Sequence, residues 1–200
     1  MKQVNRIAIL GLVLLTSAAA LAQEAKPAPA PKPLQPLLGD IDAHPNWPTA
    51  KPEDVSSVEA IVSAVYNVIS GPKGQARDWN RMRTLFLPNA RLIPARLDKD
   101  TLHADAVLLS IDDYIARSSG NMTTDGFFER GIANRVEQFG NIVHVWSTYE
   151  ARHDAAHATP FARGINSFQL LKDGDRYWVV NIFWDSERPD NPIPQKYLTK

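Results

Sequence analysis

Apolar positions along the chain follow two periods, and the first is helical. From Val58 to Ile69 apolar residues recur every three or four positions, and Gly71-Pro72 ends the run. Ser56 has the position of a capping residue before this segment. Two shorter amphipathic segments, 78–87 and 110–115, follow. The pattern predicts three helices before residue 116.

The second period is two, which is typical of strands. The predicted strands are 90–97 and 102–109, followed by four longer ones at 127–139, 142–154, 163–171 and 176–186. Gly140-Asn141 and Asp173-Gly174 supply residues that tolerate positive φ, as tight hairpins require. We therefore expect a strand pair and then an antiparallel meander of four strands.

This order of elements resembles the NTF2-like superfamily, and in particular its SnoaL-like branch, over residues 54–188. Its most specific part is Leu171-Lys172-Asp173-Gly174-Asp175-Arg176-Tyr177-Trp178-Val179-Val180-Asn181, a glycine turn followed by tryptophan and a hydrophobic strand. The resemblance implies an α+β fold: a cone made by a curved, mostly antiparallel sheet wrapped around N-terminal helices, with a pocket inside. Homodimers through the outer sheet face are common in the family. Its members include isomerases, dehydratases, cyclases and non-catalytic binders, so the fold names no reaction.

Residues 1–22 have the pattern of a secretory signal peptide. Lys2 and Arg6 precede the apolar run Ile7–Leu15, and small residues end at Ala20-Leu21-Ala22. The run is shorter than the about 20 apolar residues that span a membrane. We expect cleavage after Ala22 and a periplasmic or secreted protein that has no membrane contact afterwards.

Composition adds further expectations. Eight of the fifteen prolines fall within residues 23–53, and this density predicts an extended tether. The domain is expected to span 54–188, with a C-terminal tail at 189–200. Basic and acidic residues number 22 each, and no basic–aromatic stripe is present, so nucleic acid is not an expected partner. The absence of cysteine excludes disulfides and thiol nucleophiles.

The first hairpin turn predicts which side chains face the helices. If Gly140-Asn141 forms a two-residue turn, Phe139 lies opposite Ile142. This register places Arg130 on the inner face, and it places Glu129 on the more charged face, which is expected to meet solvent.

Extending the register across the meander predicts a pocket for a small, partly apolar molecule. Polar groups inside an apolar cone need partners, so they form either a structural network or a ligand-reading site. The two helical aromatic residues of the set fit core packing as well as ligand contact. The predicted ligand-binding residues are Arg130, Tyr149, Asn166, Asn181 and Phe183, with Tyr66 and Trp79 from the helices.

The predicted register also brings His153 near Asp185. Such a pair could act as general acid and base without a cofactor, since the carboxylate would fix the tautomer of the imidazole. Arg130 could then hold a substrate carboxylate or a developing enolate. The alternative is an ion pair between Asp185 and Arg163 or Arg188, with His153 merely exposed.

A metal site is not expected. His153-Asp154-Ala155-Ala156-His157 is similar to the zinc-binding H-E-x-x-H pattern. That chemistry needs a helix to bring both imidazoles to one face, whereas this segment follows a strand and precedes Pro160.

Three tryptophans, Trp146, Trp178 and Trp184, are predicted on the outer face of the sheet. An apolar patch of that size needs cover, either from a second subunit or from the C-terminal tail. We favour a homodimer. Three functions remain open: a binder of a small molecule in the cone, a lyase or isomerase that uses His153 and Asp185, and an interaction module whose cone is filled.

Overall fold

The computed structural model describes residues 41–199. The predicted signal peptide and most of the predicted tether lie outside the described residues. Within 41–199, no helix has both the length and the apolar character needed to cross a membrane.

A mixed sheet of six strands is the main element of the domain. Its spatial order is β2-β1-β6-β5-β4-β3, and the last four strands form the predicted antiparallel meander. β1 runs parallel to β6 and pairs with β2 along its other edge. The strands are β1 (Phe86–Leu97), β2 (Ala104–Ala106), β3 (Phe128–Phe139), β4 (Ile142–Arg152), β5 (Ala162–Asp173) and β6 (Arg176–Ser186).

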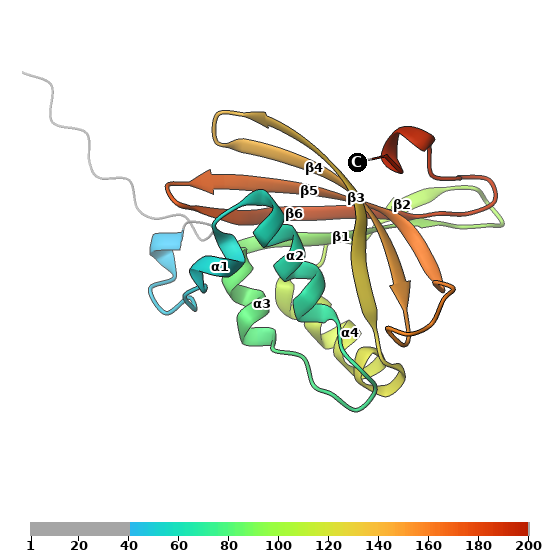
Figure 1. Cartoon of the computed structure of the whole chain (residues 1–200), viewed down its shortest axis with the longest axis horizontal. Coiled ribbons are helices and arrows are strands. Elements are labelled where there is room, and N and C mark those ends of the chain that lie inside the picture. Colours follow the sequence, from blue (N-terminus) through green and yellow to red (C-terminus); the bar gives the residue numbers. More distant parts are fainter. Residues whose placement is uncertain (1–40, 200) are drawn as a thin grey trace, which may run out of the picture. The chain divides into compact units, whose positions relative to one another are not determined.

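The α-helices gather on one side of this curved sheet (Figure 1). They are α1 (Pro52–Val55), α2 (Val58–Ile69), α3 (Trp79–Leu85) and α4 (Ile111–Asp125). Short 3-10 turns occur before them at η1 (Ile41–Ala43) and near the C-terminus at η2 (Gln195–Tyr197).

The helix starts follow from side-chain caps. The Ser57 hydroxyl, rather than that of Ser56, accepts the Ala60 N–H at the start of α2. Ser110 and Asp113 form a capping box that starts α4, and this helix runs ten residues past the predicted end at 115.

The core lies between α2 and the sheet. The apolar stripe of α2 packs onto inward residues of β4 and β5, and Ile61, Val145 and Phe168 are each 0% exposed. The apolar stripe of the helix, with its period of 3.6, packs on the apolar face of the strands, with its period of two. This contact buries the apolar faces of both layers.

A β-bulge at Ile132 changes the predicted register of β3. From Phe139 back to Ala133 the pairing with β4 is as predicted, but Gly131 then pairs with Tyr149. The extra residue reverses the faces of everything before it. Glu129 therefore lies opposite Ala151, on the inner face, and the predicted inward position of Arg130 is wrong.

A second bulge at Val180 does the same in β6. Val179 pairs with Leu170, but Asn181 pairs with Gln169, so one residue is inserted. Beyond it the predicted faces are reversed: Trp184 turns inward, while Asn181, Phe183 and Asp185 lie on the other face. The prediction that these last three face the pocket is wrong, and so is the outward position of Trp184.

The three tryptophans behind the predicted dimer have contacts within the chain: Trp178 is buried, and Trp146 and Trp184 are half-buried. Trp146 packs against Tyr197 of η2, with ring centroids 5.5 Å apart. The Arg176 guanidinium lies 3.2 Å from the Trp178 ring centroid. Trp184 lines the internal cavity. The C-terminal tail therefore covers part of the outer face, and the dimer stays a prediction.

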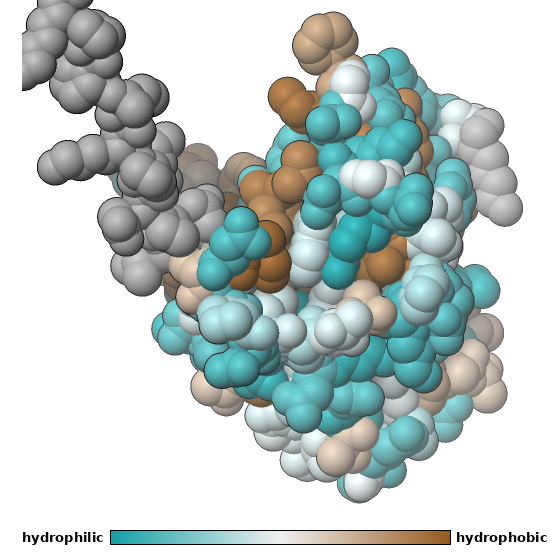
Figure 2. Space-filling view, turned by 90° about the vertical axis from the view of Figure 1, so that its left-hand side faces the viewer, coloured by the Kyte–Doolittle hydropathy of each residue, from teal (hydrophilic) through white to brown (hydrophobic). Residues whose placement is uncertain are grey.

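Exposed apolar residues remain at the β3–β4 turn. Phe139 is 85% exposed and Ile142 63%. Figure 2 shows hydrophobic residues gathered on the side of the domain that carries this turn.

Candidate functional site

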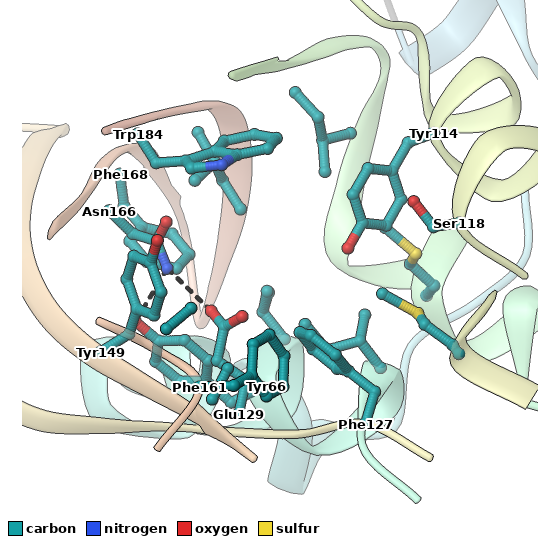
Figure 3. A pocket seen from close by; sticks show the side chains of 18 residues that line it. Tyr66, Tyr114, Ser118, Phe127, Glu129, Tyr149, Phe161, Asn166, Phe168 and Trp184 are labelled. Atoms are coloured by element: carbon teal, nitrogen blue, oxygen red, sulfur yellow. Dashed lines mark hydrogen bonds between the residues drawn. The ribbon is translucent and has the colours of Figure 1, made fainter. Parts of the chain in front are cut away.

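A cavity of about 280 Å³ lies between the helices and the inner face of the sheet. Its walls come from α2, α3, α4 and strands β1 and β3–β6, together with Phe127 and Phe161 from loops. Most wall residues are apolar or aromatic, and Figure 3 shows their side chains turned toward a shared space. The volume is near the lower end of the about 300–1,000 Å³ usual for small-molecule sites.

Glu129 is the acidic residue of this cavity. The bulge at Ile132 turns its carboxyl group inward, and no Lys, Arg or His is found among the described residues that line the cavity. Burial raises the pKa of Glu129 to about 7, which the hydrogen bond from Asn166 opposes only in part. Glu129 is half-buried rather than fully buried, because its side chain borders the cavity. Near neutral pH the carboxyl group therefore exists in both protonation states.

Asn166 connects Glu129 to a buried polar network. Its side-chain amide donates to Glu129 Oε1 at 3.1 Å and to the Tyr66 hydroxyl at 3.2 Å. The Tyr66 hydroxyl lies 2.6 Å from the Ser147 hydroxyl. The network holds the carboxyl group in place from one side and leaves its other side toward the cavity (Figure 3).

Hydroxyl groups also reach the cavity from other walls. Tyr114 comes from α4, with Ser118 one turn later, and Figure 3 shows both opposite Glu129. Burial and the Glu129 charge raise the pKa of Tyr114, so its hydroxyl keeps its proton and can donate a hydrogen bond. Tyr149 contacts Ser186 at 3.2 Å, and burial raises its pKa too.

A curved sheet around helices, with an antiparallel meander of four strands and a cavity inside, is the cone that the family resemblance implied. The chain has the NTF2-like fold. The predicted α+β class and the predicted cone are thus confirmed by the arrangement of sheet and helices, whereas membership of the superfamily and of its SnoaL-like branch stays a prediction.

Several solved structures are similar to this NTF2-like chain. One is an NTF2-like protein of unknown function from Silicibacter pomeroyi, with 16% identity, TM-score 0.45 and coverage of 65% of this chain and 92% of that one. Another is a ketosteroid isomerase-like protein from Parabacteroides distasonis, with 11% identity, TM-score 0.43 and coverage of 66% and 88%. A third is a protein of unknown function with a cystatin-like fold from Nostoc punctiforme, with 6% identity, TM-score 0.49 and coverage of 66% and 90%. At these identities the similarity concerns fold alone.

No family model matches the chain. No curated protein matches it either. The residues of the NTF2-like cavity must therefore be interpreted from their own geometry.

Of the predicted ligand-binding residues, three line the cavity: Tyr66, Tyr149 and Asn166. Trp79 packs against the core and is absent from the cavity wall. The bulges carry Arg130, Asn181 and Phe183 to positions away from the cavity.

The structure does not bring together the predicted catalytic pair. Asp185 lies 2.6 Å from Arg188 Nη1, which is the alternative that the sequence left open. His153 Nδ1 lies 3.2 Å from the Gly126 carbonyl, and its ring stacks on Phe161 with centroids 4.2 Å apart. Phe161 lines the main cavity and also a neighbouring hollow that includes His153, so His153 lies beside the cavity rather than in it.

The His153–His157 segment forms turns after β4 rather than a helix. Across the described part of the chain, no group of three His, Cys, Asp or Glu side chains is placed to hold a metal ion.

Sequence reasoning missed Glu129, Tyr114 and Ser118. A signal for Glu129 was present, because an isolated glycine inside a strand pattern, here Gly131, indicates a possible bulge. Ser118 was missed because the predicted third helix ended at residue 115, whereas Tyr114 lies inside that predicted helix and was not assigned to the pocket.

Proposed function

We propose that this NTF2-like protein binds a small, mostly apolar molecule in its cavity and that Glu129 accepts a proton from it. The observation that carries the proposal is a carboxyl group with a pKa of about 7 in an apolar cavity without a cationic partner among the described lining residues. A base with a pKa near the working pH combines a usable ionised fraction with useful basicity.

The geometry favours a substrate with an acidic C–H next to a carbonyl group. Ionised Glu129 would take the proton from carbon, and the negative charge would move onto the carbonyl oxygen. The Tyr114 hydroxyl, opposite Glu129, is the candidate donor to that oxygen. Returning the proton from Glu129 to another carbon would complete an isomerisation, and loss of a leaving group would complete an elimination.

These steps need acid–base chemistry alone, which agrees with the cofactor-free lyase or isomerase class predicted from sequence. The roles, however, pass from His153 and Asp185 to Glu129 and Tyr114. Export and a periplasmic location remain part of the proposal, because they depend on residues 1–22.

A second candidate function is binding without turnover. It is favoured by the complete hydrogen bonding of the network from Glu129 through Asn166 and Tyr66 to Ser147, since such networks also stabilise cores. In that case Glu129 would select a ligand with a hydrogen-bond donor.

Hydrogen–deuterium exchange separates the two candidates without knowledge of the natural substrate. Cyclohexanone, a small apolar ketone, would be incubated in D2O with the protein, and loss of its α-proton signal would be followed by NMR. We expect faster exchange with the wild type than with buffer, and a loss of about 100-fold or more in Glu129→Gln.

The matched control is Glu137→Gln, because Glu137 lies on the same strand but is exposed and pairs with Arg135. This variant should behave as wild type. Binding of cyclohexanone without any exchange would favour the binder, and equal exchange by wild type and Glu129→Gln would refute the role of Glu129.

A further inference from the structure

A second hollow, here called the basic groove, lies beside β3 and has a volume of about 660 Å³. β3 is the last strand in the sheet order, so one of its edges has no strand partner among the described residues. The groove is lined by Ser63 and Asn67 of α2, Arg130 of β3, Arg152 at the end of β4 and His157 of the following loop.

The groove is distinct from the cavity, although Tyr66 and Glu129 border both. Hydrogen bonds of Ser70 join the end of α2 to β3 at the groove. The Ser70 hydroxyl accepts the Glu129 N–H at 3.0 Å, and its own proton is shared between the Tyr66 carbonyl at 2.7 Å and the Glu129 carbonyl at 3.2 Å.

The charges at the groove do not balance locally. Two guanidinium groups meet one carboxylate, because Arg130 Nε donates to Glu150 Oε1 at 2.6 Å and Arg152 Nη1 reaches the same oxygen at 2.5 Å. The side chains of Glu150 and Arg152 are only 10% and 12% exposed, whereas that of Arg130 is 70% exposed. Glu150 neutralises one positive charge. Glu129 also borders the groove, but its carboxyl group is turned into the cavity, where it accepts from Asn166, so the surplus positive charge resides at the exposed guanidinium of Arg130.

Hydrogen-bond donors remain free around this surplus charge. Within residues 41–199, Arg130 Nη1 and Arg152 Nε have no hydrogen-bond partner. Asn67 Oδ1 accepts a hydrogen bond from Arg81 Nη1 at 2.6 Å. The side-chain oxygen of Asn67 is therefore occupied, and its amide N–H groups are the donors left for a ligand. The groove thus offers donors and net positive charge together.

We propose that the basic groove binds a small molecule through an oxyanion, either a carboxylate or a phosphate, with Arg130 as the main contact. A guanidinium presents planar N–H donors that match these anions, and such charge-assisted bonds are stronger than neutral ones. The sequence predicted that Arg130 holds a substrate carboxylate inside the cone; the structure places Arg130 at the groove beside β3 instead, and the proposal assigns it an oxyanion there. The proposal needs neither an apolar ligand nor ionised Glu129, so it stands apart from the proposed function.

Calorimetric titration of the full-length protein with inorganic phosphate, and separately with acetate, tests this site. Ionic strength would be held constant with NaCl so that general screening does not change. We expect saturable binding of at least one of the two anions, and the tighter one indicates the oxyanion preferred. Arg130→Gln should weaken that binding about tenfold or more.

Arg135→Gln is the matched control, because Arg135 is an exposed arginine of the same strand that pairs with Glu137 at 3.2 Å. It should bind like the wild type. Backbone NMR should place the largest anion-induced shifts at Arg130, Arg152 and His157. Absence of saturable binding by both anions, equal weakening in both variants, or shifts centred elsewhere would overturn the proposal.

Discussion

The Asn166 side-chain amide donates a hydrogen bond of 3.1 Å to Glu129 inside a cavity whose other walls are mainly apolar. This hydrogen bond is the one interaction that lowers the pKa of Glu129 against the larger effect of burial. The two residues come from strands β3 and β5, which are not neighbours in the sheet. Their contact therefore depends on the curvature that brings both strands around the cavity.

Replacing Asn166 with leucine should raise the pKa of Glu129 above its wild-type value. Leucine removes the donor that favours the ionised carboxylate and adds apolar surface. Carbon-13 NMR of the glutamate carboxyl groups would measure the shift. Asn181→Leu is the control: Asn181 lies outside the cavity wall, so this variant should leave the midpoint unchanged. An equal shift in both variants would contradict the structure.

The stability of Glu129→Gln relative to the wild type should be greater at pH 9 than at pH 4. The folded-state pKa of about 7 is above the ordinary value of 4.5, so the folded protein binds this proton more tightly than the unfolded chain. The contribution to stability is therefore lost as pH rises from about 4.5 to about 7. Glutamine cannot ionise and escapes this loss, so the variant should gain up to about 3 kcal/mol at pH 9 relative to pH 4. Urea unfolding at the two pH values measures this difference, and a constant difference would contradict it.

Arg77→Met should reduce the free energy of unfolding by about 3 kcal/mol. The buried guanidinium donates to the carbonyl groups of Ile69 at 2.9 Å, Gly71 at 2.6 Å and Met122 at 3.0 Å, and also to that of Gln75. It thereby joins the end of α2, the following loop and α4. Methionine would leave these carbonyl groups without their donor.

Urea unfolding would measure the cost of Arg77→Met. Arg135→Met provides the comparison, because Arg135 is more than half exposed and should change stability by less than about 0.5 kcal/mol. Similar losses in the two variants would show that the buried contacts of Arg77 are not the cause.

Removing residues 189–200 should destabilise the domain and promote self-association. Thr148 Oγ1 donates to the Tyr197 carbonyl at 2.5 Å, and the Tyr197 ring covers Trp146. Without the tail, Trp146 would be exposed on the outer sheet face, where association would bury it. Analytical ultracentrifugation of the full-length and shortened chains measures this. A shortened chain with unchanged mass and stability would show that the tail adds nothing.

The order of helices and strands could be predicted from the sequence because turns and helix caps depend on local residues. Gly140 and Gly174 have φ of 56° and 54° at the two predicted hairpins, and Asp78 and Ser110 cap helices where the pattern placed them. The residues around these positions fix the turns and caps without help from the rest of the fold.

The candidate site could be predicted only in part, since it depends on two inserted residues. The bulges at Ile132 and Val180 reverse the faces of Glu129 and Trp184, and each depends on how the strand curves against its neighbours. Tyr149 and Asn166 lie on β4 and β5, which pair with each other without a shift and carry no inserted residue, and both side chains line the cavity as predicted. The strict alternation of inward and outward side chains along a strand thus holds from the turn to the first bulge, and beyond the bulge the predicted faces are reversed.

Titration of the Glu129 carboxyl group in the wild-type protein would show whether this group can act as a base near neutral pH. Glutamate labelled with carbon-13 at the carboxyl position would be followed by NMR from pH 3 to 10, with Glu129→Gln used to assign the signal. We expect a midpoint near pH 7, because burial in the cavity opposes ionisation. A midpoint near the ordinary value of 4.5 would mean that water reaches the carboxylate freely, and Glu129 would then lack the property on which its proposed role as base rests.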